Sequence, residues 1–124
     1  MIASTTAAPG GAPPIRRVVL VDDHRMFTEA LAVVLAAEPD LRVVDRCPAG
    51  EPDLLGRVAT SRPDVVVVDV EPRGEQAGEL VHELVGSAAV LVLTASSDPG
   101  QLVDAMRAGA AGWIGKASTP AELV

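Results

Sequence analysis

Short aliphatic runs alternate with helix-like segments along most of the chain. From Ile15 onward, the runs IRRVVLV, LRVVDR, DVVVVD, AAVLVLT and AGWIG predict strands, and their β-branched content is typical of strands buried on both faces. Helical patterns lie over residues 25–37, 51–61, 76–86 and 98–108, and Thr119-Pro120-Ala121-Glu122 has the capping pattern of a fifth helix. This alternation predicts an α/β fold, a flavodoxin-like, doubly wound five-stranded parallel sheet with strand order 2-1-3-4-5.

The spacing of apolar residues predicts which face of each helix meets the core. In the first helix the apolar stripe is expected at Met26, Ala30, Val33 or Val34, and Ala37. The corresponding apolar positions of the next two helices are Leu54, Leu55 and Val58, and then Leu80, Val81, Leu84 and Val85.

Length and charge limit the possible functions. The 124 residues can support one modest domain over residues 15–124, preceded by a disordered leader over residues 1–14. The net charge of -7 disfavours direct contact of this segment with nucleic acid. A single cysteine, Cys47, excludes an intrachain disulfide and suits a reducing compartment, and no run is long enough for a membrane span. The fifth helix is cut short, so we expect the natural protein to continue past Val124.

Polar residues close four of the predicted strands. Asp22-Asp23 follow VVLV, Asp69 follows VVVV, Thr94 follows VLVL and Lys116 follows Trp113-Ile114-Gly115. Ligands of open parallel sheets bind beyond the carboxyl ends of the strands, so these side chains are expected to share one pocket. The topological switch point lies between strands one and three, which carry the aspartates.

The expected pocket combines oxygen ligands with a nucleophile. Crowded carboxylates need shifted pKa values or a cation, and an oxygen-only set favours Mg²⁺. With Mg²⁺ bound, a carboxylate can attack phosphorus while the ion, an ammonium and a hydroxyl share the charge of the transferring phosphoryl group. Asp69, Lys116 and Thr94 fit the roles of nucleophile, ammonium and hydroxyl.

The motifs VDDHRMF, PDVVVVD, LTAS and GWIGK together closely resemble the receiver domain of bacterial two-component response regulators, over residues 15–124. The resemblance implies that Asp69 is the phosphoacceptor and that Asp22 and Asp23 hold Mg²⁺. It further implies that Thr94 is the switch hydroxyl, Lys116 the phosphoryl-binding lysine and Trp113 the switch aromatic.

The resemblance also implies partners. The motifs DDHRMF and GAAGWIGKAS are most similar to receivers that precede a helix-turn-helix output domain, so DNA would be contacted only by a domain beyond Val124. It implies a cytoplasmic protein that forms a homodimer and receives its phosphoryl group from a sensor histidine kinase. Such a domain is not an enzyme beyond its Mg²⁺-dependent self-phosphorylation and self-dephosphorylation.

The segment after Asp69 departs from the family pattern. Receivers usually run through a Met-Pro pair, with proline four places after the acceptor, whereas here Pro72 stands three places on. Glu71 occupies the position whose backbone carbonyl the family places on Mg²⁺, and its side chain could add an anion there. Ala117 also replaces the proline that often follows the lysine, which makes a cis peptide there unfavourable. These departures motivate an alternative, a phosphorylation-independent receiver that acts as a dimerisation or ligand-binding module.

Simpler interpretations exist for several residues. Asp22-Asp23 could merely cap the first helix, Trp113 could be a core residue, and His24 is expected to be a polar loop residue at the pocket mouth.

A phosphatase of the haloacid dehalogenase type also uses Asp, Thr and Lys at strand ends. That class expects two aspartates separated by one residue after a single strand, which this chain lacks. A dinucleotide site is disfavoured because no glycine-rich turn follows the first strand.

Overall fold

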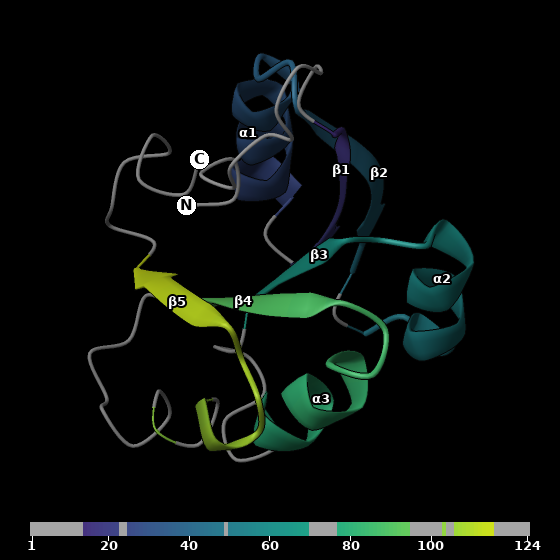
Figure 1. Ribbon diagram of the computed structural model, residues 1–124, viewed down its shortest axis with the longest axis vertical. Helices are drawn as coiled ribbons and strands as arrows, with labels where there is room; N and C mark the ends of the chain where they lie inside the picture. The colour runs from purple at the N-terminus through teal and green to yellow at the C-terminus, as the bar shows by residue number, and fades with distance from the viewer. Residues whose placement is uncertain are drawn as a thin grey trace.

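The computed structural model describes residues 14–22, 25–48, 50–69, 77–94, 103 and 106–115. A five-stranded parallel sheet lies between two layers of helices, with strand order β2-β1-β3-β4-β5 (Figure 1), as predicted. The elements are β1 (Arg16–Val21), α1 (Arg25–Ala36), β2 (Leu41–Cys47), α2 (Leu54–Ser61), β3 (Val65–Asp69), α3 (Ala77–Leu84), β4 (Ala89–Thr94) and β5 (Gly112–Gly115).

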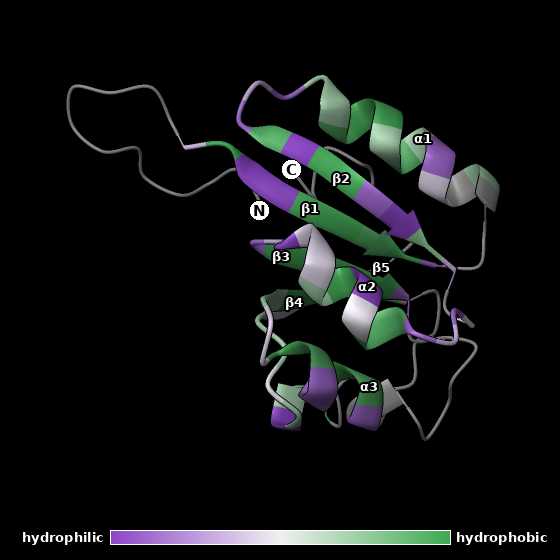
Figure 2. Cartoon of the chain, turned by 90° about the vertical axis from the view of Figure 1, so that its right-hand side faces the viewer, coloured by the Kyte–Doolittle hydropathy of each residue, from purple (hydrophilic) through white to green (hydrophobic). Residues whose placement is uncertain are grey.

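Two apolar clusters hold the helices to the sheet. Alternate strand residues point to opposite faces, so β1 sends Val19 and Val21 to one cluster, and Val18 and Leu20 to the other. The first cluster lies under α2 and α3, whereas the second lies under α1 (Figures 1 and 2). The predicted core positions of the third helix are confirmed, since Leu80, Val81 and Leu84 are buried and Val85 packs against them.

The predicted core face of α1 is wrong. Met26 is 86% exposed and Val33 is 72% exposed, and Ala30 and Ala37 are also exposed, whereas Val34, the alternative to Val33, is half-buried. The helix instead buries Thr28, Leu31 and Leu35 against the sheet. Nine of the twelve residues in RMFTEALAVVLA are apolar, so helical spacing fits more than one face. The bulkier leucines fill the space above β1 and β3 better than alanine does.

The second helix differs slightly from its prediction. It begins at Leu54 rather than at residue 51, and it buries Leu54 and Val58 while Leu55 is exposed. It ends where Arg62 adopts the left-handed region, with φ of 49°. The Arg17 guanidinium caps this end, because its Nη2 donates to the Ser61 carbonyl at 2.7 Å and its Nε donates to the Arg62 carbonyl at 3.1 Å.

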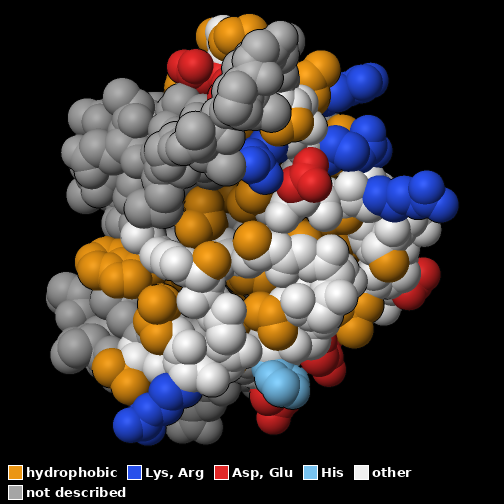
Figure 3. Space-filling view, viewed as in Figure 1, with side chains coloured by type: hydrophobic (Ala, Val, Ile, Leu, Met, Phe, Trp, Pro, Cys, Tyr) orange, Lys and Arg blue, Asp and Glu red, His pale blue; other side chains and the backbone are white. Residues whose placement is uncertain are grey.

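Strand β2 forms one edge of the sheet and carries features that discourage pairing with another chain. The register with β1 shifts between Val18 and Val19, which pair with Val43 and Asp45 and leave one extra residue on β2. The exposed positions Arg42 and Arg46 carry charges, and Figure 3 shows arginine side chains along this side of the molecule.

Several predicted elements lie outside the described residues. These are the leader apart from Pro14, most of the fourth helix expected over residues 98–108, and the fifth helix from Thr119. Within the part of the chain that is described, no helix is both long and apolar enough to cross a membrane.

Candidate functional site

Two buried carboxylates lie side by side at the carboxyl end of the sheet. Val21 of β1 pairs with Val68 of β3, so Asp22 and Asp69, which come next, occupy neighbouring positions. Adjacent strands are about 4.8 Å apart, which brings both carboxylates within reach of one ligand. Asp22 is 7% exposed and Asp69 is 0% exposed. The sequence prediction that Asp22 and Asp69 come together at the switch point is therefore confirmed.

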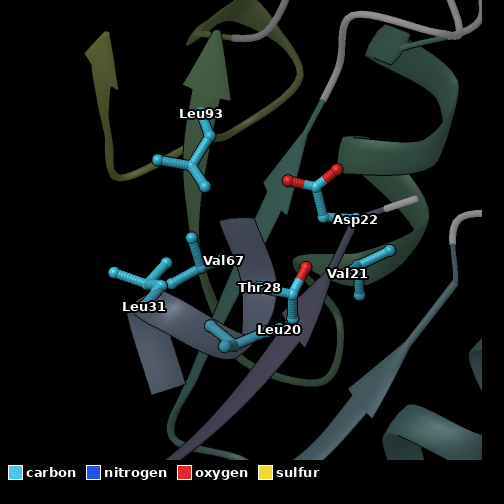
Figure 4. Close-up of a pocket in the computed structure, with 7 residues that line it drawn as sticks. All are labelled: Leu20, Val21, Asp22, Thr28, Leu31, Val67 and Leu93. Atoms are coloured by element: carbon cyan, nitrogen blue, oxygen red, sulfur yellow. The ribbon is translucent and has the colours of Figure 1, made fainter. Parts of the chain in front are cut away.

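The surroundings of Asp22 come from three elements. Its backbone N–H donates to the Cys47 carbonyl at 3.1 Å, which ties the end of β1 to the end of β2. Beneath it lies a small apolar hollow without room for a water molecule, lined also by Thr28 and Leu31 of α1 (Figure 4). Thr28 is a buried polar residue beside the site that the sequence analysis missed, because the face of α1 was assigned incorrectly.

The backbone places two further predicted residues at the same edge of the sheet. Asp69 pairs with Leu93, so Thr94 lies one position beyond it on β4, and Thr94 itself pairs with Gly115 of β5. Lys116 directly follows Gly115 in the sequence. The side chain of Thr94 lies outside the described part of the structure, as do Asp23, His24, Glu71 and Lys116, so their roles stay predictions.

The donor set fits a hard divalent cation. Among the described residues, no cluster of three or more histidine, cysteine or acidic side chains could hold a metal ion. Asp22 and Asp69 nevertheless supply two buried oxygen ligands, and Mg²⁺ typically takes one or two carboxylates and keeps several waters. The residues present therefore suit Mg²⁺, with Asp23 and the Glu71 carbonyl as predicted additional ligands.

Trp113 is not a core residue. It is 47% exposed on β5 and lines an open hollow with Val103, Met106 and Arg107. The chain reaches β5 through Gly109, whose φ of 111° favours glycine and whose missing Cβ would approach Val85 Cγ1 at 3.3 Å. The switch role of Trp113 stays a prediction.

An ion pair joins β2 to α2 beside the site. The Arg57 guanidinium donates from Nε to Asp45 Oδ2 at 2.8 Å and from Nη2 to Asp45 Oδ1 at 2.9 Å, and it also contacts Glu51. These bonds lower the pKa of Asp45 and raise that of Arg57. The ion pair between Asp45 and Arg57 therefore stabilises the folded chain at neutral pH. This stabilisation is lost only in acid, as the pH falls through the lowered pKa of Asp45.

Cys47 is expected to be unreactive in the folded protein. It is 2% exposed, and burial together with the nearby Asp45 carboxylate raises the pKa of its thiol to about 11. At pH 8 only about one thiol in a thousand is then a thiolate. We expect labelling by a disulfide reagent at least about 100-fold slower in the native protein than in urea, with a rate that still rises with pH above 9. Equal rates in the two states would contradict this placement of Cys47.

Comparison with protein families and curated proteins relates the chain to signalling proteins. The family model of the response regulator receiver domain matches residues 18–124. The DNA-binding transcriptional activator DevR/DosR of Mycobacterium tuberculosis is 34% identical over 103 residues, covering 81% of this chain and 47% of that protein. The transcriptional regulatory protein LiaR of Bacillus subtilis is 32% identical over 111 residues, covering 86% and 52%. The chain thus spans about half the length of these relatives.

Solved structures show the same architecture. The signal receiver domain of the putative response regulator NarL from Mycobacterium tuberculosis superposes with a TM-score of 0.76 and 30% sequence identity, covering 90% of this chain and 92% of that one. A LuxR-family two-component response regulator from Aurantimonas sp. gives a TM-score of 0.74 at 30% identity, covering 88% and 79%. This chain therefore has the same fold as these receiver domains, and Asp22 and Asp69 lie at the switch point of that fold.

Proposed function

The chain belongs to the response regulator receiver domain family, and on that premise we propose that it accepts a phosphoryl group on Asp69. The observation that carries the proposal is the pair of buried carboxylates, Asp22 and Asp69, at adjacent strand ends. Asp69 ends β3 at the centre of the sheet, where it pairs with Leu93 of β4 and directly follows Val68, which pairs with Val21 of β1.

The proposed reaction is a substitution at phosphorus. An oxygen of the Asp69 carboxylate forms a bond to the phosphorus of the donor, the bond from phosphorus to the leaving group breaks, and the leaving group takes that electron pair. Asp22 would hold Mg²⁺, together with Asp23 and the Glu71 carbonyl. Bound Mg²⁺ would neutralise charge on the phosphoryl oxygens. Lys116 would bind the phosphoryl group, and Thr94 and Trp113 would respond to it.

The proposed partners follow the family. The phosphoryl donor would be a sensor histidine kinase in the cytoplasm, and phosphorylation would change association between copies or the activity of a DNA-binding output domain beyond Val124. The domain would catalyse only its own phosphorylation and dephosphorylation. The relatives DevR/DosR and LiaR, which are transcriptional regulators by name, support an output of this kind.

Intact mass spectrometry tests the proposal. The chain is incubated with acetyl phosphate and Mg²⁺, and we expect it to gain one phosphoryl group. Adding EDTA before the donor should prevent this gain. Asp69→Asn should gain none. Glu83→Gln, which removes one carboxylate from the exposed face of α3, should behave as the parent. Phosphoryl gain in Asp69→Asn, or no gain in the folded parent chain, would contradict the proposal, and the second result would favour the phosphorylation-independent alternative.

A further inference from the structure

An irregularity in β2 turns the carboxyl end of this strand toward α2. Val43 packs against the cluster under α1, whereas Cys47, four residues later, belongs to the cluster under α2 and α3. Residues an even number of places apart in a regular strand face the same side of the sheet, so a regular β2 would not allow this. The register shift supplies one extra residue, and Val19, which faces α2 and α3, pairs with Asp45. Asp45 and Cys47 therefore both face α2.

Arg57 of α2 holds this end of β2 through a side chain and a backbone group. Its guanidinium bonds both oxygens of the Asp45 carboxylate, at 2.8 and 2.9 Å, and its Nη2 also donates to the Arg46 carbonyl at 3.3 Å. The Asp45 Oδ1 atom accepts the Arg46 backbone N–H at 2.8 Å. A bidentate pair of guanidinium and carboxylate fixes orientation as well as distance. The Arg57–Asp45 pair therefore holds the peptide groups on both sides of Arg46.

The residue after Arg46 bonds directly to the backbone of the site. The Cys47 carbonyl accepts the Asp22 backbone N–H at 3.1 Å. Val21 is the last residue of β1, so this bond extends the pairing of β1 with β2 by one residue, to Asp22. Figure 2 shows the hydrophilic end of β2 beside the end of β1. A continuous set of contacts thus leads from Arg57 through the end of β2 to Asp22.

We propose that the Arg57–Asp45 ion pair positions Asp22 for Mg²⁺, by holding the end of β2 whose Cys47 carbonyl bonds the Asp22 backbone. This inference rests on the proposed function, which assigns Mg²⁺ to Asp22. Mg²⁺ demands nearly octahedral geometry, so a displaced carboxylate binds it less well. Arg57 and Asp45 act through Cys47 and Asp22 rather than on the ion, so both are positioning residues. Loss of a group that orients a metal ligand typically lowers metal affinity by about tenfold or more.

The signs of two substitutions separate positioning from a simple effect of charge. Arg57→Met removes a positive charge, which by Coulomb attraction alone would tighten Mg²⁺ binding, whereas Asp45→Ala removes a negative charge and would weaken it. Positioning predicts that both variants weaken Mg²⁺ binding, because each breaks the same ion pair. Arg57→Lys keeps the charge but cannot form the bidentate pair, so its Mg²⁺ affinity should lie between those of the parent and Arg57→Met.

Arg17 provides the matched control for Arg57. Its guanidinium also anchors α2, through the Ser61 carbonyl at 2.7 Å and the Arg62 carbonyl at 3.1 Å, and Arg17→Met causes the same loss of charge. Arg17 lies near the amino end of β1, five residues before Asp22 and roughly 16 Å from it along the strand. If Arg57 acted only by stabilising α2, the two substitutions would have the same effect on the site.

Calorimetric titration of the unphosphorylated chain with Mg²⁺ tests the proposal. We expect the dissociation constant for Mg²⁺ to rise about tenfold in Arg57→Met and in Asp45→Ala, and to stay within about twofold of the parent in Arg17→Met. Unchanged or tighter binding in Arg57→Met, or an equal loss in Arg17→Met, overturns the inference and leaves the proposed function intact. A parent chain that binds no Mg²⁺ overturns the metal assignment of the proposed function, and this inference with it.

Amide hydrogen exchange tests the structural link without Mg²⁺. The exchange rate of the Asp22 amide is measured by NMR in EDTA and divided by that of the Val67 amide in β3, which corrects for a general loss of stability. This ratio should rise at least about tenfold in Arg57→Met and in Arg57→Lys, because the Cys47 carbonyl is then held less firmly, and it should not change in Arg17→Met. An unchanged ratio in both Arg57 variants would show that the ion pair does not hold Asp22, and the inference would fail.

Discussion

Replacing Leu35 with alanine should lower the free energy of unfolding by about 2–5 kcal/mol. Leu35 is fully buried and packs with Leu31 against Val18, Leu20 and other strand residues of the cluster under α1. Removing its side chain loses buried apolar surface and leaves a cavity that the sheet cannot fill, because parallel strands are held in register on both sides. A domain of this size has a total stability of roughly 5–15 kcal/mol, so the variant loses a large share of it.

The neighbouring Val33 provides the matched control. Val33→Ala removes a similar amount of apolar side chain two residues away, but from the exposed face of α1. We expect a change within about 0.5 kcal/mol. Both variants are measured by urea unfolding at the same low micromolar protein concentration. Equal losses in the two variants would show that α1 does not bury the face containing Leu35.

Mg²⁺ should stabilise the folded chain through the carboxylate pair. A ligand that binds only the folded state at ten times its dissociation constant adds about 1.4 kcal/mol to the free energy of unfolding. Asp22→Asn removes one of the two described carboxylates that we propose bind the ion. If its affinity falls tenfold, the gain shrinks to about 0.4 kcal/mol at the same Mg²⁺ concentration.

The measurement compares urea unfolding in EDTA and in Mg²⁺ for each protein. Glu83→Gln again removes one negative charge from an exposed position, so it shows how much of the Mg²⁺ effect is general screening. The metal assignment fails if Asp22→Asn keeps the full Mg²⁺-dependent gain. Asp69→Asn should lose the gain as well, because it removes the other described carboxylate.

The strands and their order could be predicted from the sequence. Runs such as VVVV in β3 fit few structures other than a central strand, because a β-branched stretch buried on both faces suits the centre of a parallel sheet. The convergence of Asp22 and Asp69 followed from topology, since the carboxyl ends of parallel strands meet at one edge. The pairing of Thr94 with Gly115 places the backbone leading to Lys116 at that same edge.

The orientation of α1 could not be predicted in the same way. Helical spacing identifies a face only where polar residues mark the opposite one, and α1 has only three polar residues among twelve, of which Thr28 is buried. Its docking depends on which side chains fill the space over the sheet, and this selected Leu31 and Leu35 over Met26 and Val33. Thr28, which lies beside the site, was missed for the same reason.

The sequence by itself determined the strand order and the meeting of Asp22 with Asp69, because both follow from the local order of apolar runs and their polar ends. Only the tertiary structure decided the buried face of α1, the Arg57–Asp45 pair beside Cys47 and the exposure of Trp113. These features depend on packing between elements that are distant in the sequence. The shape and volume of the side chains decide which face of an element is buried where the pattern of apolar residues fits several faces equally well.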